Sequence, residues 1–219
     1  MLDIKSFQNT NIFKCQPGDR DTMAVRMREL EWISNLISNQ GHNLEFGVYK
    51  ARTINKLSDC CKDKLFYGFD SFRGLPEDWD MGDKYVKKNR FHLDELPKVN
   101  FNVKLIEGFF EDTLKEWIEE NNLKYISFLH IDCDLYSSTK YVLRVLAPFI
   151  KKDTIIRFDE LACWRSVFGE EDHPNVPRSY YKNWQDHEWK ALNEWVEEEK
   201  MEFKILCRNW FQSAVIQIQ

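Results

Sequence analysis

Two aspartates stand close together after an apolar run, Asp132 and Asp134 in the string FLHIDCDLYSS. In a regular strand, side chains two positions apart face the same side. Like charges at the end of a strand repel each other, and they are costly near a core unless a cation or a proton is shared between them. The pair therefore indicates either a divalent metal site or a general base.

A second acidic pair, Asp159 and Glu160, follows the next apolar run, TIIRF. The carboxyl ends of neighbouring parallel strands lie side by side, so all of these carboxylates could converge. Ligation by oxygen alone suits a hard cation such as Mg²⁺, whereas zinc prefers nitrogen or sulfur. The alternative is that the acids cap the helices that follow, since Asp and Glu are favoured at helix starts.

A further aspartate, Asp70, ends an earlier apolar run in FYGFDSFRGLPEDW, and Ser71 follows it. Nucleotide-binding α/β proteins place at the end of their second strand a carboxylate that accepts hydrogen bonds from both ribose hydroxyls. Asp70 is therefore a candidate ribose ligand. The alternative is that Asp70 caps the next turn, with Ser71 in a similar role.

The string LEFGVYKART, residues 44–53, has the pattern of a strand that turns into a helix. Glu45 could meet an ammonium or ribose group, and Gly47 would let the backbone approach a ligand beside the helix amino terminus. Such a turn suits a charged nucleoside cofactor. Tyr49 and Ala51 stand where the usual spacing has glycines, so a strand, turn and helix without a ligand would look similar.

These side chains require a sheet to position them, and the chain alternates short apolar runs with amphipathic ones. The alternation predicts parallel strands joined by right-handed helical crossovers. A leading helix is expected over residues 22–38, and the last two apolar runs, FKILCRN and SAVIQIQ, predict an antiparallel hairpin. Three continuously apolar runs are typical of strands covered on both faces: 65–70, 126–132 and 154–158. We expect one α/β domain over residues 1–219, built on a doubly wound, mostly parallel sheet.

Two long polar connections, residues 73–100 and 161–185, interrupt this alternation. Long loops in a compact domain are usually lids or binding loops, so we expect both to overhang the site and select the substrate. His187, after the second connection, is a candidate base, or else a solvated histidine at a helix start. Three tryptophans could stack on a ligand or simply pack the loops: Trp79, Trp164 and Trp184.

Composition excludes several classes of protein. The 43% hydrophobic and 15% aromatic residues suffice for a core in one domain of 219 residues. A net charge of −5 without a basic stripe argues against nucleic acid as a partner. The sequence shows neither an apolar run long enough for a membrane span nor a signal-peptide pattern, and its six cysteines lack metal-site spacing. We expect a cytoplasmic protein with reduced thiols and no membrane partner.

Five strings, EFGVY, GFDSFRGLPED, EGFFEDTL, HIDCDLYSST and FDEL, resemble the macrocin O-methyltransferase family over residues 44–162. Members of that family methylate sugar hydroxyls of natural products with S-adenosylmethionine and Mg²⁺. The resemblance implies a Rossmann-like class I methyltransferase fold with a seven-stranded sheet. The predicted carboxyl-terminal hairpin agrees with it, because ordinary dinucleotide-binding sheets usually lack that ending.

The resemblance also implies roles for single residues. The residues implied at the cofactor are Glu45 and Gly47 at the methionine portion, Tyr49 in the same turn, Asp70 and Ser71 at the ribose, Gly108 and Phe109 at the adenine, and Asp132. Asp132 would bind metal together with Asp159 and Glu160, while Asp134 is either another ligand or the base. The family often has Asp where Glu160 stands and glycine near Ala51, so the match is incomplete at both sites.

The resulting hypothesis is methyl transfer from S-adenosylmethionine to a hydroxyl of a small molecule, assisted by Mg²⁺, with a carboxylate or His187 removing the proton. One alternative is a non-catalytic module or partner subunit that binds the cofactor, but cofactor binding alone does not require a carboxylate cluster. Another is a nicotinamide-dependent dehydrogenase, which would need a tighter glycine loop than EFGVYKA. Exposed aromatic loops could also support a homo-oligomer.

Overall fold

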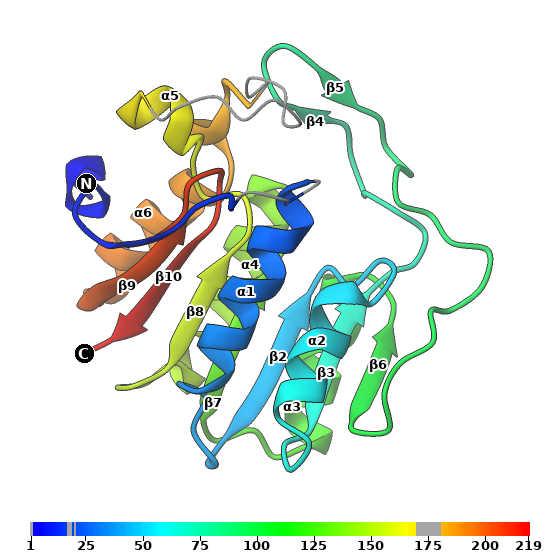
Figure 1. The fold of residues 1–219 in the computed structure, drawn as a ribbon. Helices are drawn as coiled ribbons and strands as arrows, with labels where there is room; N and C mark the ends of the chain where they lie inside the picture. Colours follow the sequence, from blue (N-terminus) through cyan, green and yellow to red (C-terminus); the bar gives the residue numbers. More distant parts are fainter. Residues whose placement is uncertain (1, 17–18, 20, 170–180) are drawn as a thin grey trace.

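The computed structural model of the protein describes residues 2–16, 19, 21–169 and 181–219. Its centre is an eight-stranded sheet with the order β1-β9-β10-β8-β7-β2-β3-β6 (Figure 1). The strands of this sheet are β1 (Asn11–Phe13), β2 (His42–Phe46), β3 (Phe66–Asp70), β6 (Val103–Glu107), β7 (Ile126–Ile131), β8 (Ile155–Phe158), β9 (Phe203–Asn209) and β10 (Ala214–Ile218).

The direction of the strands confirms the predicted topology. The neighbouring strands β8, β7, β2, β3 and β6 pair in parallel, in that order across the sheet. β10 lies antiparallel to both β8 and β9. The carboxyl-terminal hairpin is therefore present. The expected number of seven strands is wrong, because β1 pairs in parallel with β9 and adds an eighth strand at the edge. β1 has only three residues, too few to show a strand period in the sequence.

Helices cover both faces of the sheet (Figure 1). One face carries α1 (Thr22–Ser34) and α2 (Arg52–Cys60), and the other carries α3 (Phe110–Glu120), α4 (Tyr136–Leu146) and α6 (Glu188–Glu199). The leading helix is shorter than the expected range of 22–38: α1 ends at Ser34, and Asn35 is its C-cap. The two helical layers bury the central strands, and every residue of β7 and β8 is buried. This explains why those strands are continuously apolar over most of their length.

The two long connections meet above the carboxyl ends of the parallel strands. The first contains a small hairpin of β4 (Trp79–Asp80) and β5 (Tyr85–Val86), and the described part of the second contains α5 (Trp164–Phe168) and η3 (Trp184–Asp186). A bridge between Gly82 and Tyr181 joins the two connections. Residues 170–180 of the predicted second lid lie outside the described residues.

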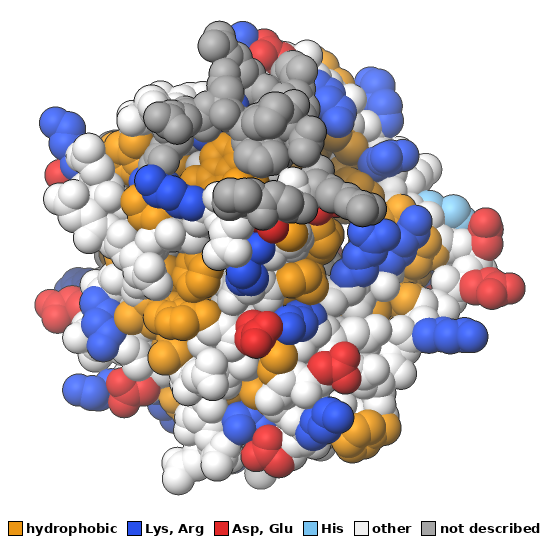
Figure 2. All heavy atoms as spheres, in the orientation of Figure 1, with side chains coloured by type: hydrophobic (Ala, Val, Ile, Leu, Met, Phe, Trp, Pro, Cys, Tyr) orange, Lys and Arg blue, Asp and Glu red, His pale blue; other side chains and the backbone are white. Residues whose placement is uncertain are grey.

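The surface carries charges of both signs. In Figure 2, acidic and basic side chains are interspersed over the face that carries α1 and α2, with hydrophobic side chains between them. No helix among the described residues is long and apolar enough to cross a membrane. All six cysteines carry free thiols.

Candidate active site

A cavity of about 530 Å³ opens at the carboxyl ends of β2, β3, β7 and β8. Its volume lies in the range of small-molecule sites. The walls include most of the residues expected at the cofactor and the metal: Gly47, Tyr49, Asp70, Ser71, Phe109, Asp132, Asp134 and Glu160. The topology explains this convergence, because parallel strands deliver the residues that follow them to one edge of the sheet.

The turn after β2 forms one wall of the cavity, and it requires unusual backbone geometry. Gly47 has φ +90°, and a Cβ added there would lie 1.8 Å from the carbonyl oxygen of Asp132. Tyr49 and Ala51 also adopt left-handed conformations, with φ of 46° and 57°. The turn thus keeps the tight shape of a glycine loop although two of these positions carry side chains, which costs strain. Only Gly47 must be glycine for steric reasons.

Asp70 holds this turn in place from the end of β3. One carboxylate oxygen, Oδ2, accepts hydrogen bonds from the backbone N–H groups of Val48 and Tyr49, each 2.8 Å long. The other, Oδ1, accepts from the N–H of Phe72 at 2.7 Å. Asp70 therefore caps its own turn, as the alternative interpretation held, and it also lines the cavity. Oδ2 accepts two of these bonds and Oδ1 only one, so Oδ1 keeps one lone pair that could accept a hydrogen bond from a ligand.

Asp132 and Asp134 follow β7 and face the same cavity. Asp134 is 8% exposed and has φ +62°, a strained conformation that aspartate tolerates better than most residues. Burial and the neighbouring Asp159 raise the pKa of Asp132 to about 7. Burial, followed by the charges of Asp132 and Asp159, raises the pKa of Asp134 well above its usual value. Both aspartates therefore hold protons more tightly than ordinary carboxyls.

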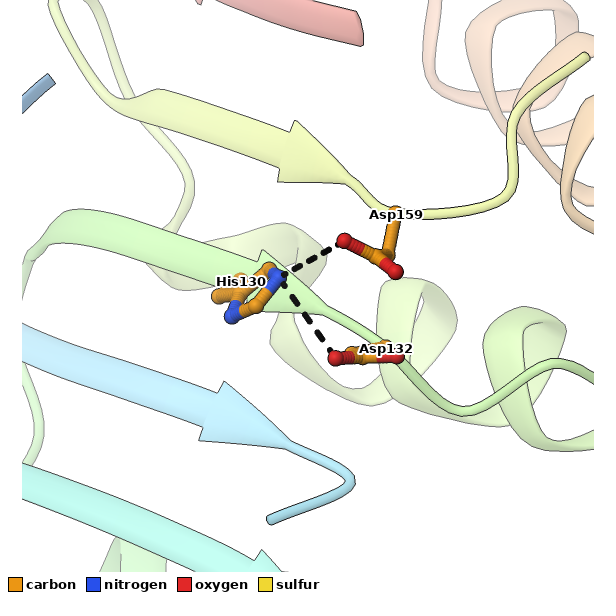
Figure 3. Close-up of side chains that lie close together, drawn as sticks. All are labelled: His130, Asp132 and Asp159. Carbon is orange, nitrogen blue, oxygen red and sulfur yellow. Dashed lines mark ion pairs between the residues drawn. The ribbon is translucent and has the colours of Figure 1, made fainter. Parts of the chain in front are cut away.

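Two overlapping groups of side chains in this region could hold a metal ion. One consists of His130, Asp132 and Asp159 (Figure 3), and the other of Asp132, Asp134 and Glu160. In each group, the candidate ligand atoms lie within 4.8 Å of one another. The second group offers only carboxylate oxygens, which is the donor set that Mg²⁺ prefers. The buried Oε2 of Glu160 has no hydrogen-bond partner among the described residues, so it is available to a ligand.

A cation from α1 already lies among these carboxylates. The guanidinium of Arg26 forms a close ion pair with Asp159, and it lies 3.8 Å from Oδ2 of Asp132 and 3.7 Å from Oε1 of Glu160. Burial opposes ionisation of Asp159, but Arg26 and Arg157 hold its pKa well below the usual value. Sequence reasoning did not find Arg26, because it lies more than 100 residues from the acids that it contacts.

A buried network of side chains supports the acids. His130 is fully buried, and its Nδ1 lies 2.8 Å from Oε2 of Glu45, whose Oε1 accepts a hydrogen bond from Thr53. Arg157, also fully buried, donates to Oε2 of Glu29 and pairs with Asp159. The ends of β7 and β8 are thus fixed by a network that includes side chains of β2, α2 and α1, and sequence spacing contains no signal for such long-range pairs.

Glu188, at the start of α6, is a further acid that sequence reasoning missed. It is fully buried, and its Oε2 accepts a hydrogen bond from the backbone N–H of Glu160. Burial and the charges of Asp159, Asp132 and Asp134 raise the pKa of Glu188 well above its usual value. The cluster therefore contains more carboxyl groups than its arginines can balance, and it requires protons or an additional cation.

Several predicted residues lie outside the cavity wall. Glu45 is 1% exposed, and both of its oxygens have protein partners, whereas Gly108 lies next to the wall residue Phe109. Asp159 forms an ion pair with Arg26 and does not line the cavity. His187 is also absent from the wall; its Nε2 lies 2.8 Å from the carbonyl oxygen of Asp80, in the lid hairpin.

The three tryptophans can now be distinguished. Trp79 lines the cavity. Trp164 is fully buried, stacks on Phe7 with ring centroids 5.2 Å apart, and donates a hydrogen bond to a backbone carbonyl. Trp184 packs edge-on against Trp189. Only Trp79 is therefore placed to contact a ligand, and the other two pack the core.

Comparison with solved structures shows similarity to methyltransferases. The calicheamicin methyltransferase CalS11 has 22% identity and a TM-score of 0.60, with 90% of this chain and 78% of that chain covered. The O-methyltransferase NovP has 17% identity and a TM-score of 0.55, with 88% and 78% covered. An O-methyltransferase from Bacillus cereus, in complex with SAH, has 12% identity and a TM-score of 0.53, with 98% and 86% covered. At these identities the likeness concerns the fold.

Sequence comparison identifies the family. A search of curated proteins gave no match. A family model described as a methyltransferase domain matches residues 44–161, which include the β2 turn, Asp70, both acidic pairs and most of the cavity wall. This match covers more than half of the chain, and the protein therefore belongs to the methyltransferase-domain family.

Proposed function

We propose that the protein is an S-adenosylmethionine-dependent O-methyltransferase that acts on a hydroxyl of a small molecule, with a sugar moiety as the favoured acceptor and Mg²⁺ as an auxiliary cation. One observation carries the proposal. A single cavity is lined at one place by Asp70 and the β2 turn and at another by the carboxylates of Asp132, Asp134 and Glu160. A nucleoside cofactor and a cation-bound acceptor could thus be held side by side.

The cofactor part of the cavity is formed by the β2 turn and the residues after β3 and β6. Asp70 has the carboxylate that would accept hydrogen bonds from the ribose hydroxyls. Phe109 and Phe110 supply an aromatic wall for the adenine, and Gly47 leaves room for the methionine portion. When bound, S-adenosylmethionine would supply an activated methyl group on a sulfonium sulfur.

The metal part of the cavity fits a hard divalent cation. Asp132 and Glu160 offer carboxylate oxygens that lie close to Asp134, and the buried Oε2 of Glu160 has no hydrogen-bond partner among the described residues. When bound, Mg²⁺ would lower the pKa of an acceptor hydroxyl and orient it. The cluster also has an excess of carboxyl groups, so a divalent cation would relieve its repulsion.

Asp134 is the residue that we assign to the acceptor proton. It lines the cavity beside Asp132 and Glu160, so its carboxylate can take the acceptor proton while those two residues hold the cation. With the cofactor held by Asp70 and the β2 turn, the transfer would form a bond from the hydroxyl oxygen to the methyl carbon and break the carbon–sulfur bond. The hydroxyl proton passes to a carboxylate oxygen of Asp134. His187 is less suited, because one ring nitrogen faces the carbonyl oxygen of Asp80 outside the cavity wall.

The acceptor side of the cavity is apolar and aromatic, with Leu75, Trp79, Phe91 and Tyr49 in its wall. Flat aromatic faces of this kind can stack on a sugar ring. Comparison supports the same class of acceptor, because CalS11, 20% identical in a second structure, is described as a TDP-rhamnose 3'-O-methyltransferase in calicheamicin biosynthesis. The motif resemblance to macrocin O-methyltransferases agrees with this acceptor class.

The test combines cofactor binding with turnover. We would measure S-adenosylmethionine affinity by calorimetry and methyl transfer to a panel of nucleotide-linked deoxysugars and phenols. Asp134→Asn should lower kcat by roughly 100-fold or more and leave the cofactor Kd within about twofold. The matched control is Asp153→Asn, because Asp153 also has a left-handed backbone, φ 70°, but is exposed before the amino end of β8.

Each outcome is decisive. Cofactor binding with turnover that Asp134→Asn abolishes and Asp153→Asn retains would support the proposal. Cofactor binding without turnover on any acceptor would favour a non-catalytic module, and no cofactor binding at all would contradict the proposal as a whole.

A further inference from the structure

The guanidinium of Arg26 lies at the point where the proposed metal ligands meet. It forms an ion pair with Oδ2 of Asp159 and lies within 4 Å of Oδ2 of Asp132 and Oε1 of Glu160. All three carboxylates belong to the groups that could hold a metal ion. Arg26 comes from α1, so a helix far from these acids in the sequence supplies the cation.

We propose that Arg26 is an internal counter-ion that competes with the divalent cation for these carboxylates and must be displaced before the cation binds. The proposal rests on the metal site of the proposed function. It assigns to α1 a role in controlling metal affinity, which the mechanism of methyl transfer does not require.

The competition follows from charge and from geometry. Arginine remains protonated in proteins, so its positive charge cannot be removed by loss of a proton. Mg²⁺ requires oxygen ligands at about 2.0–2.1 Å in octahedral geometry, which brings it close to any other group on the same oxygens. The guanidinium lies within 4 Å of an oxygen atom on each of Asp132, Asp159 and Glu160. Two cations at this site would repel each other strongly.

The structure distinguishes this arginine from a fixed one in the same cluster. Arg157 has a completely buried side chain and is held by Glu29 at 2.7 and 3.1 Å. The side chain of Arg26 is 22% exposed and lines the cavity. Arg26 therefore has open space into which it can move, whereas Arg157 is enclosed. Arg157 stays as a permanent charge partner, and Arg26 is the exchangeable one.

The experiment titrates Mg²⁺ alone into the cofactor-free protein by calorimetry. Arg26→Ala should bind Mg²⁺ roughly tenfold to 100-fold more tightly than the wild type, because a charge-assisted contact no longer has to be broken. Arg28→Ala is the matched control. Arg28 lies on the same helix and pairs with Asp19 at 2.7 Å, away from the cavity wall, so its removal should leave Mg²⁺ affinity unchanged.

A second measurement separates competition from local repacking. Guanidinium ion at millimolar concentration should weaken Mg²⁺ binding to Arg26→Ala, because it can refill the space of the missing side chain, and an equal concentration of Na⁺ should not. Arg26→Lys keeps a positive charge and should stay within a few-fold of the wild-type affinity. If Arg26→Ala does not fold, Arg26→Met is titrated instead, since it keeps the length and apolar stem of the side chain.

Equal or weaker Mg²⁺ binding by the neutral variants would overturn the proposal, as would the absence of any guanidinium effect. Absence of Mg²⁺ binding in every variant would overturn it as well. These readouts involve neither S-adenosylmethionine nor methyl transfer. An enzyme that transfers methyl groups but fails the Mg²⁺ tests would refute the counter-ion role of Arg26 and leave the O-methyltransferase assignment in place.

Discussion

Replacement of Asp70 tests the cofactor pocket most directly, because this residue has two functions that a single substitution removes together. Its carboxylate accepts two backbone hydrogen bonds of 2.8 Å that fix the β2 turn and one of 2.7 Å from Phe72 in the turn after β3. Hydrogen bonds to charged groups contribute about 1.5–3 kcal/mol each, and water replaces part of this at a partly exposed site. We therefore expect Asp70→Ala to lower the free energy of unfolding by about 2–4 kcal/mol.

The same substitution should weaken cofactor binding by more than the turn alone explains. Oδ1 keeps one lone pair for a ribose hydroxyl, and loss of this charged acceptor corresponds to about 1.5–3 kcal/mol, which is roughly a tenfold to 100-fold increase in the Kd for S-adenosylmethionine. Calorimetry would measure the Kd at a temperature where urea titration shows the variant to be folded. Asp78→Ala is the control, because Asp78 also accepts a backbone hydrogen bond, from Lys88 at 2.7 Å, but lies outside the cavity wall.

Asp70→Ala separates the two functions of this side chain. A folded Asp70→Ala protein that is less stable but binds S-adenosylmethionine with the wild-type Kd would show that Asp70 only caps the turn. In that case the ribose role would be refuted, and the cofactor would have to be held by other residues of the cavity wall.

Three further predictions concern stability, measured by urea unfolding in the presence of EDTA. Gly47→Ala should lower the free energy of unfolding by about 3 kcal/mol or more, because its Cβ would collide with a backbone oxygen. Gly169→Ala is the control: Gly169 has φ +64° but nothing within 4 Å of the added Cβ, so the loss should be about 1–2 kcal/mol. Equal losses would contradict the steric argument. Arg157→Gln should lower the free energy of unfolding by about 3–5 kcal/mol, because it leaves buried carboxylates unpaired. The control Arg144→Gln changes an exposed arginine and should lower it by about 0.5 kcal/mol or less. Burial raises the pKa of Glu188, and an acid whose folded pKa is raised loses folding stability as pH rises above its unfolded value, about 4.5. The stability of Glu188→Gln relative to the wild type should therefore increase as pH rises from 5 to 8, and a constant difference over that interval would refute this charge assignment.

The sequence predicted the parts of the site that depend on local patterns. Asp70, Asp132 and Asp134 follow apolar runs, and a strand period of two with parallel topology is enough to place such residues at one edge of a sheet. The carboxyl-terminal hairpin was also predictable, because the short link between its strands allows only antiparallel pairing.

The charged side chains that reach the acids from other elements could not be predicted in this way. Arg26 comes from α1 and Glu188 from α6, and their positions depend on how these helices pack on the sheet. His130 occupies an interior strand position that an apolar residue could equally fill. The partner of Glu45 was equally absent from the sequence pattern: its buried side chain pairs with His130, and its expected role at the cofactor stays a prediction.

The strand β1 protects part of one edge of the sheet against aggregation. An unpaired strand at the edge of a sheet offers its backbone N–H and C=O groups to another chain, and native proteins protect such edges against aggregation. β1 pairs with Cys207, Arg208 and Asn209, so the carboxyl-terminal half of β9 is covered by the protein's own first residues. The opposite edge, β6, is short and carries the exposed charges of Lys104 and Glu107. The covered half of β9 and the charged edge of β6 are thus poor templates for growth by another copy of the chain.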